Sequence, residues 1–121
     1  CCCNACWATP RKPNVTANLL NMAAPAANRW ERRLEKLVVI HAKRLKLEVY
    51  KFSSPGRRGV PDRMFINKRG RVCFIELKAH GKKPDPMQER EMKILMKRDV
   101  LAIWSSDIDE CKEFLNEFSE L

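Results

Sequence analysis

The sequence predicts an α/β fold in which a mixed four-stranded sheet is flanked by helices. Three segments repeat apolar residues at three- and four-residue steps, which is the period of a helix, and short segments rich in β-forming residues lie between them. The first three expected strands follow one another directly, and the fourth comes only after a helix. A meander, a crossover helix and a strand give a mixed sheet, with the order helix, three strands, helix, strand, helix.

The first half of the pattern is expected to hold one helix and three strands. The helix spans about 29–47, with Asn28 as its N-cap. Its apolar stripe consists of Trp30, Leu34, Leu37, Val38, His41 and Leu45. Strands are expected at about 48–52, 63–67 and 71–78. Between the last two, Lys68-Arg69-Gly70 has the composition of a hairpin loop, with Gly70 in the left-handed conformation.

The second half is expected to hold a helix, a strand and a final helix. The first helix spans about 86–98, with Asp85 as its cap and a proline tolerated in its first turn. A short apolar strand covers 100–104. The last helix starts at Ser106 or Asp107 and runs to about Phe118.

Length and charge restrict the class of protein. A chain of 121 residues is one domain at most, and its formal net charge of +9 favours an anionic partner, with nucleic acid the obvious candidate. A basic, solvated surface without a partner is the alternative interpretation. No apolar run approaches the roughly 20 residues that a membrane span needs, so we expect no membrane association.

Residues 1–28 differ from the rest of the chain. They contain no acidic residue, show no helical or strand period, and hold four of the six cysteines, Cys1, Cys2, Cys3 and Cys6. We interpret this stretch as a flexible tail or as sequence upstream of the functional start. The clustering argues against a disulfide framework, and no second Cys or His pair follows at zinc-finger spacing. We therefore expect reduced thiols and a cytoplasmic protein.

The hairpin brings charged residues together. If its loop is 68–70, paired positions sum to 138, and Asp62 lies opposite Glu76, although a bulge would shift this register by one residue. Because side chains alternate along a strand, Glu76 and Lys78 share one face with Phe74. One edge of the sheet therefore gathers Asp62, Glu76 and Lys78.

This grouping has a chemical use. Two converging carboxylates bind a hard divalent cation such as Mg²⁺, which prefers oxygen ligands. The cation polarises a scissile phosphate and lowers the pKa of water, and a neighbouring lysine positions the water or stabilises developing charge. The alternative is a solvated Glu-Lys pair at i and i+2. We favour the functional interpretation because two charges interrupt an apolar strand opposite Asp62.

Other polar residues are expected around this centre. Gln88 lies in the first turn of the following helix and points toward the hairpin end, where it could hold water or phosphate or instead bond backbone amides. Glu31 and Glu35 lie one turn apart on the first helix, and either could reach a metal or remain solvated. The cations expected to hold the phosphate backbone are Lys51, Arg57, Arg58, Arg63, Lys82 and Lys83.

Two histidines and two tryptophans have less specific roles. His41 is expected to pack on the core side of the first helix, while His80 follows Lys78 closely enough to touch a substrate. Trp30 and Trp104 are expected in the core.

Three ordered motifs resemble a known family. They are Lys51-Phe52-Ser53-Ser54-Pro55-Gly56-Arg57-Arg58-Gly59-Val60-Pro61-Asp62-Arg63, then Phe74-Ile75-Glu76-Leu77-Lys78-Ala79, then Pro86-Met87-Gln88. The set is similar to the virus-type replication-repair nuclease (VRR-NUC) domain, particularly its short stand-alone versions in phages and prophages. That family belongs to the PD-(D/E)xK nuclease superfamily, so the resemblance implies a restriction-endonuclease-like core over 29–121.

The resemblance implies DNA cleavage that depends on Mg²⁺ or Mn²⁺, with branched DNA as a substrate, in phage replication, repair or recombination. Asp62 and Glu76 match the metal-binding acids, Lys78 matches the catalytic lysine, and the Leu77 carbonyl would be a further ligand. Gln88 matches the family glutamine, and Glu31 fits the first-helix acid better than Glu35. Stand-alone members look dimeric, so a homodimer is expected. Two alternatives are a DNA-binding scaffold without activity and a resolvase of four-way junctions.

Overall fold

The computed structural model describes residues 27–121, and their side chains from Arg29 onward. The element order is α3 (Ala27–Arg44), β1 (Glu48–Lys51), β2 (Arg63–Ile66), β3 (Val72–Leu77), α4 (Pro86–Lys97), β4 (Leu101–Ser105) and α5 (Ile108–Glu120). The predicted order of helices and strands is therefore confirmed. The expected tail at 1–28, with its four cysteines, lies outside the described residues except for its last two, which belong to α3.

The sheet has the strand order β1-β2-β3-β4. β1, β2 and β3 form an antiparallel meander, and β4 pairs with β3 in parallel after the crossover through α4. The predicted hairpin register is confirmed, because Arg63 faces Ile75 and Ile66 faces Val72. Gly70 has a φ of 78°, in the left-handed region that was expected for it.

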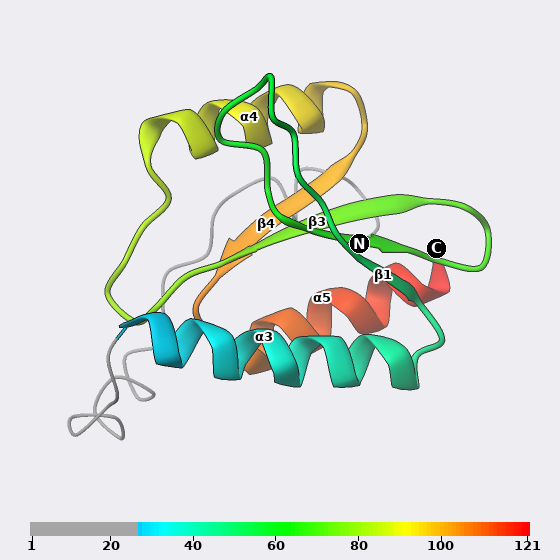
Figure 1. Ribbon diagram of the computed structural model, residues 1–121. Helices are drawn as coiled ribbons and strands as arrows, with labels where there is room; N and C mark the ends of the chain where they lie inside the picture. Colours follow the sequence, from blue (N-terminus) through cyan, green and yellow to red (C-terminus); the bar gives the residue numbers. More distant parts are fainter. Residues whose placement is uncertain (1–26) are drawn as a thin grey trace.

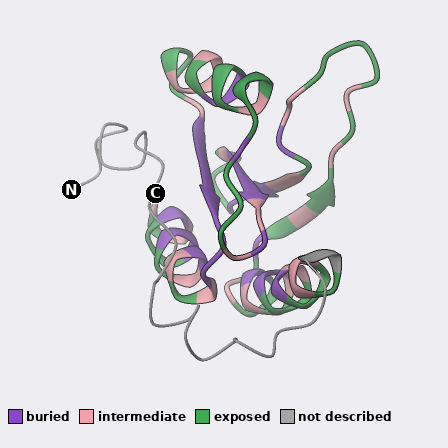
Figure 2. Cartoon of the chain, turned by 90° about the vertical axis from the view of Figure 1, so that its left-hand side faces the viewer, coloured by how far each residue is buried: buried purple, intermediate pink, exposed green. Residues whose placement is uncertain are grey.

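The helices cover the two faces of the sheet unequally. α3 and α5 lie together on one face and α4 lies alone on the other (Figure 1). Side chains that alternate along β3 divide between the two layers: Cys73 and Ile75 join the larger core beneath α3 and α5, and Phe74 joins the smaller core beneath α4. The buried residues follow the sheet and the inward sides of the helices (Figure 2).

The first helix differs from the expectation at both ends. It begins at Ala27, so Asn28 lies inside it and is not its N-cap. It ends at Arg44, because Lys46 takes a φ of 60° and the Leu47 N–H turns back to the Ala42 carbonyl. These turn contacts close the helix three residues before the predicted boundary.

The predicted apolar stripe of α3 was also partly wrong. Leu34 and Val38 are buried as expected, but Leu37 is 42% exposed, and Ala42 takes a fully buried place instead. The small Ala42 side chain carries little sequence signal, although it packs closely. Trp30 is half-buried against the ring of His80, with centroids 4.2 Å apart, and is not part of either core cluster.

The remaining helices agree more closely with the expectations. Asp85 caps α4 through a reciprocal box with Gln88, and Asp107 caps α5. His41, expected on the core side of α3, is only partly buried and lies in neither core cluster; its Nε2 is 2.8 Å from Asn116 Oδ1 on α5. Cys73 and Cys111 are buried free thiols. Within the described residues, no helix has the length and apolar character needed to cross a membrane.

Candidate active site

Glu76 lies at the centre of the candidate site, near the carboxyl end of β3 on the face covered by α4. Its residue exposure is 8%. Asp62 comes immediately before β2, and its backbone N–H faces Glu76 closely enough to lower the pKa of that carboxyl. The confirmed register, continued by one position beyond Arg63–Ile75, is what brings Asp62 opposite Glu76. The backbone N–H of Lys78 donates to the Ser105 carbonyl, so β3 stays fixed beside β4 past Glu76.

Two side chains converge on one oxygen of Glu76. Gln88 Nε2 donates to Glu76 Oε1 at 2.8 Å, and Lys78 Nζ lies 3.3 Å from the same oxygen. Gln88 is itself held by the helix cap, because its Oε1 accepts from the Asp85 backbone N–H at 3.0 Å. Gln88 therefore plays both roles that the sequence suggested. It bonds a backbone amide, and it points toward the acidic centre formed by Asp62 and Glu76.

The surroundings of Glu76 disfavour its charged form. Burial raises the pKa of Glu76 above its ordinary value, and the negative charge of Asp62 raises it further. The ammonium of Lys78 and the N–H of Asp62 act in the opposite direction without cancelling the rise. The site therefore holds negative charge that its own cations and donors only partly balance.

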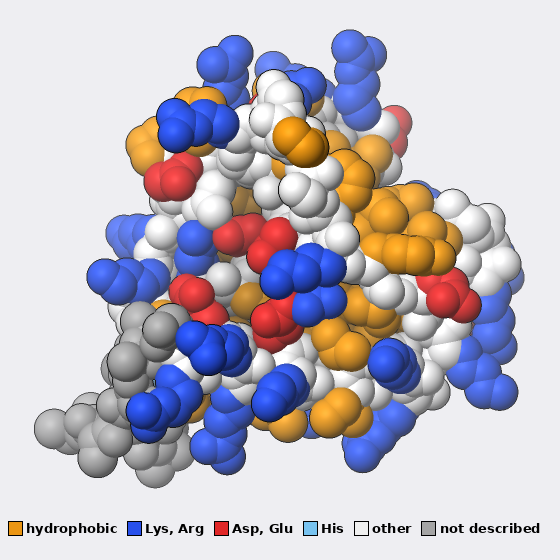
Figure 3. Space-filling model, in the orientation of Figure 1, with side chains coloured by type: hydrophobic (Ala, Val, Ile, Leu, Met, Phe, Trp, Pro, Cys, Tyr) orange, Lys and Arg blue, Asp and Glu red, His pale blue; other side chains and the backbone are white. Residues whose placement is uncertain are grey.

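A polar cleft of about 560 Å³ opens over these carboxylates. Its walls are residues 58–60 of the β1–β2 loop on one side and the first turn of α4 on the other, with Asp62 and Glu76 between them. In the space-filling view, acidic side chains gather near the middle of the molecule with Lys and Arg side chains around them (Figure 3). A cleft of this size and polarity admits a phosphate group together with part of the attached sugar.

The donor set of this cleft fits a hard divalent cation. Asp62, Glu76 and the Leu77 carbonyl would all supply oxygen ligands, which Mg²⁺ and Mn²⁺ prefer. A cation between the carboxylates would offset the like-charge repulsion that helps to raise the pKa of Glu76. Among the described residues, no three His, Cys, Asp or Glu side chains cluster closely enough to hold a metal ion by themselves. Such a site would thus also need backbone oxygen and water.

The two first-helix acids have different surroundings. Glu31 Oε1 accepts from the Ala79 backbone N–H at 3.0 Å, so this carboxylate lies at the end of β3, next to Lys78. Glu35 is bound to Arg63, whose Nε donates to Glu35 Oε1 at 2.6 Å. Glu31 is therefore bound at the end of β3, three residues beyond Glu76, while Glu35 is paired with Arg63.

The cations expected to contact DNA fall into two groups. Arg57 is paired with Glu91 at 2.8 Å, and Arg63 is paired with Glu35. The other four are exposed or at the cleft wall and have no ion pair within residues 29–121: Lys51, Arg58, Lys82 and Lys83. The sequence did not indicate this division, because ion pairs between distant segments leave no local pattern.

Two residues that the sequence analysis did not single out shape the cleft. Gly59 has a φ of 83°, and a Cβ placed on it would lie 2.5 Å from the Met87 carbonyl oxygen, so only glycine permits this approach of the loop to α4. Glu91 is 7% exposed and is the partner of Arg57. The sequence could have indicated a buried role for Glu91, because this acidic residue lies beside Met92 on the apolar side of the helix.

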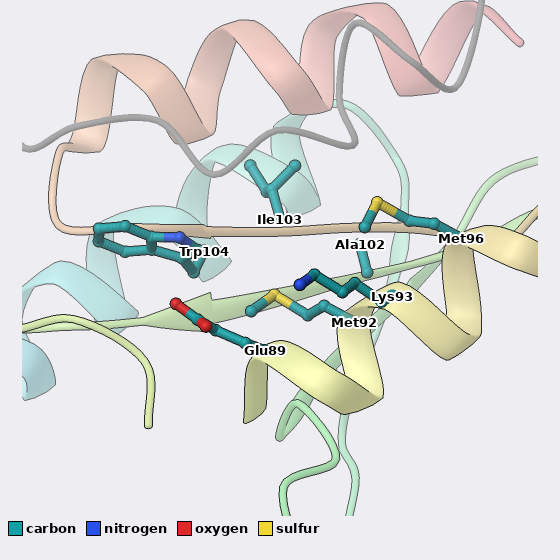
Figure 4. A pocket seen from close by; sticks show the side chains of 7 residues that line it. All are labelled: Glu89, Met92, Lys93, Met96, Ala102, Ile103 and Trp104. Carbon is teal, nitrogen blue, oxygen red and sulfur yellow. The ribbon is translucent and has the colours of Figure 1, made fainter. Parts of the chain in front are cut away.

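A second cavity, of about 240 Å³, lies on the other side of α4. It opens between α4 and β4 and is lined mainly by Met92, Met96, Ala102 and Trp104, with Glu89 and Lys93 nearby (Figure 4). Its walls are apolar and it contains neither Asp62 nor Glu76. It is therefore not the candidate active site.

Comparisons with known proteins agree with this geometry. A protein of Acyrthosiphon pisum secondary endosymbiont phage 1, named "Putative nuclease p44", is 39% identical over 88 residues, which cover 71% of this chain and 95% of that protein. A solved structure described as a VRR_NUC domain is 30% identical, with a TM-score of 0.67, over 74% of this chain and 97% of that one. The chain belongs to the VRR-NUC family. No family model matches it.

Membership of the VRR-NUC family confirms the resemblance that the three sequence motifs indicated. It also confirms the fold class, a mixed four-stranded sheet with three flanking helices. The acidic cleft lies on the part of this VRR-NUC domain where the first two motifs meet across the β2–β3 hairpin.

Proposed function

We propose that this VRR-NUC protein is a nuclease that hydrolyses phosphodiester bonds of DNA with the help of Mg²⁺ or Mn²⁺. The observation that carries the proposal is the convergence of Lys78 and Gln88 on Glu76, beside Asp62, at the floor of an open polar cleft. Family membership and the name of the phage relative support the same reaction class.

Asp62, Glu76 and the Leu77 carbonyl would hold the cation, with Glu31 as the first-helix acid near the same strand end. The bound cation would supply a Lewis acid for the scissile phosphate and a lower pKa for the attacking water. Lys78 would lie beside the reacting phosphate and stabilise the negative charge that develops on it. Gln88 would fix the orientation of Glu76, and Asp85 would fix Gln88.

Cations around the cleft would hold the sugar-phosphate backbone. Arg58 lines the cleft, and the chain as a whole carries a net charge of +9. Contacts to phosphates give affinity without reading base sequence, so binding is expected to weaken as salt rises.

Several finer features complete the proposal and derive from the family resemblance. We propose that the substrate is branched DNA, that the protein acts as a homodimer, and that it serves phage replication, repair or recombination in the cytoplasm of a bacterial host. A dimer presents two active sites and thus suits the cutting of two strands. A resolvase would share the chemistry and differ only in the shape of its substrate.

Incubation of the purified protein with labelled linear, flapped and four-way DNA tests the proposal. Each substrate is combined with Mg²⁺, Mn²⁺ or EDTA, and Glu76→Ala is run beside the wild type. Glu89→Ala is the matched control, because it removes an exposed carboxylate one residue from Gln88. We expect metal-dependent cleavage that is lost in Glu76→Ala and retained in Glu89→Ala.

The substrate panel separates the alternatives. Preference for flaps supports a repair-type nuclease, and symmetric cutting of four-way DNA supports a resolvase. Binding without cleavage in either metal would reject the nuclease and favour a DNA-binding scaffold.

A further inference from the structure

The β1–β2 loop presents two adjacent arginines that have different surroundings. The loop extends on the α4 side of the sheet in both ribbon views (Figures 1 and 2). Its base is closed where the Phe52 N–H donates to the Asp62 carbonyl at 2.7 Å. Arg57 and Arg58 lie within it, four and five residues before Asp62. They carry the same charge and cannot be distinguished by sequence alone.

Arg57 forms an ion pair with α4, although its side chain is 54% exposed. Its Nε donates to Glu91 Oε1 at 2.8 Å, and the Glu91 side chain is only 9% exposed. A carboxylate removed from water in this way needs a cationic or hydrogen-bonding partner to remain charged. The ion pair ties the loop to α4, and the charge of Glu91 offsets that of Arg57. Arg57 therefore offers little net attraction to an external phosphate.

Arg58 is exposed like Arg57 but differs in its contacts. It lines the cleft that contains Asp62 and Glu76, and it has no hydrogen-bond or ion-pair partner within residues 29–121. A guanidinium can bind a phosphate through two parallel hydrogen bonds when no protein group competes for it. Its position at the wall of the cleft is suited to a phosphate near the acidic centre.

Gly59 fixes the loop at the position next to Arg58. Its α-carbon approaches the Met87 backbone so closely that a Cβ would lie 2.5 Å from the Met87 oxygen. Together with the Arg57–Glu91 pair, this contact attaches the loop to α4 at two points that flank Arg58. The backbone next to Arg58 is therefore held close to α4, at the wall of the cleft.

We propose that Arg58 is a substrate-positioning residue that binds a phosphate of the DNA strand in the cleft, and that Arg57 positions the loop without contacting DNA. This inference rests on the proposed function. It assigns opposite roles to two neighbouring arginines of equal charge, so each is the natural control for the other.

The salt dependence of DNA binding distinguishes the two roles. Binding of a labelled duplex by the full chain is measured in EDTA, where no cleavage occurs, over a series of KCl concentrations. Each phosphate contact contributes roughly 0.9 to the slope of log affinity against log salt. Arg58→Ala is expected to lower the magnitude of the slope by about 1. Arg57→Ala is expected to leave the slope at its wild-type value.

Cleavage kinetics provide a second readout. Arg57→Ala is expected to lower kcat with KM nearly unchanged, because the loop loosens while the Gly59 contact keeps Arg58 at the cleft wall. Arg57→Lys should recover kcat. Arg58→Ala is expected to raise KM. If Arg57→Ala does not fold, as judged by thermal melting, the double variant Arg57→Gln with Glu91→Gln replaces it. This double variant removes both charges, retains a hydrogen-bonding pair and should keep the wild-type slope.

The outcomes separate this inference from the proposed function. If the wild type neither binds nor cuts DNA, the proposed function fails and this inference fails with it. If the wild type binds and cuts DNA but Arg57→Ala lowers the slope as much as Arg58→Ala, only the assignment of the two arginines is overturned. An unchanged slope in both variants also overturns it, because the loop then makes no phosphate contact.

Discussion

Gln88 Nε2 donates to Glu76 Oε1 at 2.8 Å, so the first turn of α4 is joined directly to the acidic centre on β3. The same side chain completes the N-terminal capping box with Asp85. The start of the helix and the orientation of the carboxylate are therefore coupled through one residue. A change at Gln88 should affect both the stability of α4 and the chemistry of the cleft.

Gln88→Ala is expected to lower metal affinity or cleavage rate by about 10- to 100-fold, the usual effect of removing a residue that orients a metal ligand. It should also cost roughly 0.5–2 kcal/mol of stability through the weakened cap. Cleavage is measured as a function of Mg²⁺ concentration, beside thermal melting. Asp85→Ala is the control: it weakens the cap but leaves the bond from Gln88 to Glu76. Equal loss of activity in both variants would mean that Gln88 acts only through helix stability.

Glu76→Gln is expected to stabilise the protein at neutral pH while abolishing cleavage. Burial and Asp62 raise the pKa of Glu76 above its ordinary value of 4.5, so the folded state binds its proton more tightly than the unfolded state does. This proton binding stabilises the folded protein at a pH below the ordinary pKa, and the stabilisation is lost as the pH rises through the raised pKa of the folded state. Glutamine carries no charge, so at neutral pH the variant should be more stable than the wild type by roughly 0.5–2 kcal/mol.

Thermal melting over a pH series in EDTA measures this effect. The wild type should lose stability, relative to Glu76→Gln, as the pH rises above the ordinary range of a carboxyl. Added Mg²⁺ should then raise the melting temperature of the wild type, because a ligand that binds only the folded state stabilises it, and should leave the variant nearly unchanged. A variant that is less stable than the wild type at neutral pH in EDTA would contradict the prediction.

Gly59→Ala is expected to lower both stability and activity, while Gly56→Ala does neither. The alanine at position 59 would combine a φ of 83° with a Cβ 2.5 Å from the Met87 oxygen, and a left-handed residue alone costs roughly 1–3 kcal/mol. A Cβ at position 56 would meet nothing within 4 Å. Melting temperatures and cleavage rates of the two variants are compared. Equal behaviour would show that the loop does not depend on its approach to α4.

The sequence predicted correctly those positions that depend on nearby residues and on the regular period of strands and helices. A three-residue hairpin loop fixes the register of its strands, and that register alone put Asp62 opposite Glu76. The alternation of side chains along β3 then separated Phe74 from Cys73 and Ile75. Asp85 as a cap also follows from local chemistry, because its partner is only three residues away.

The features that the sequence did not indicate depend on distant segments meeting. Arg57 and Glu91 are 34 residues apart, and Arg63 and Glu35 are 28 apart, so nothing local showed that two of the expected DNA contacts are occupied. The approach of Gly59 to Met87 is likewise a contact between a loop and a helix. Such contacts are decided by the packing of α4 over the sheet, which periodicity does not specify.

Glu31→Gln and Glu35→Gln are expected to have different effects, although the two acids lie one turn apart on α3. Glu31 bonds the Ala79 N–H at the end of β3, and glutamine can keep that bond while losing the charge. The variant should need more Mg²⁺ for half-maximal cleavage, with its melting temperature preserved. Glu35→Gln leaves the Arg63 guanidinium, 17% exposed, without its carboxylate, and should cost roughly 1–3 kcal/mol.

Cleavage titrated with Mg²⁺, together with thermal melting, separates the two acids. For Glu35→Gln the Mg²⁺ requirement should match the wild type once the temperature is kept well below the transition. The reverse pattern, with a raised Mg²⁺ requirement in Glu35→Gln alone, would make Glu35 the acid that serves the cation. The cation would then bind Glu35 Oε2, because Oε1 accepts both contacts from the Arg63 guanidinium.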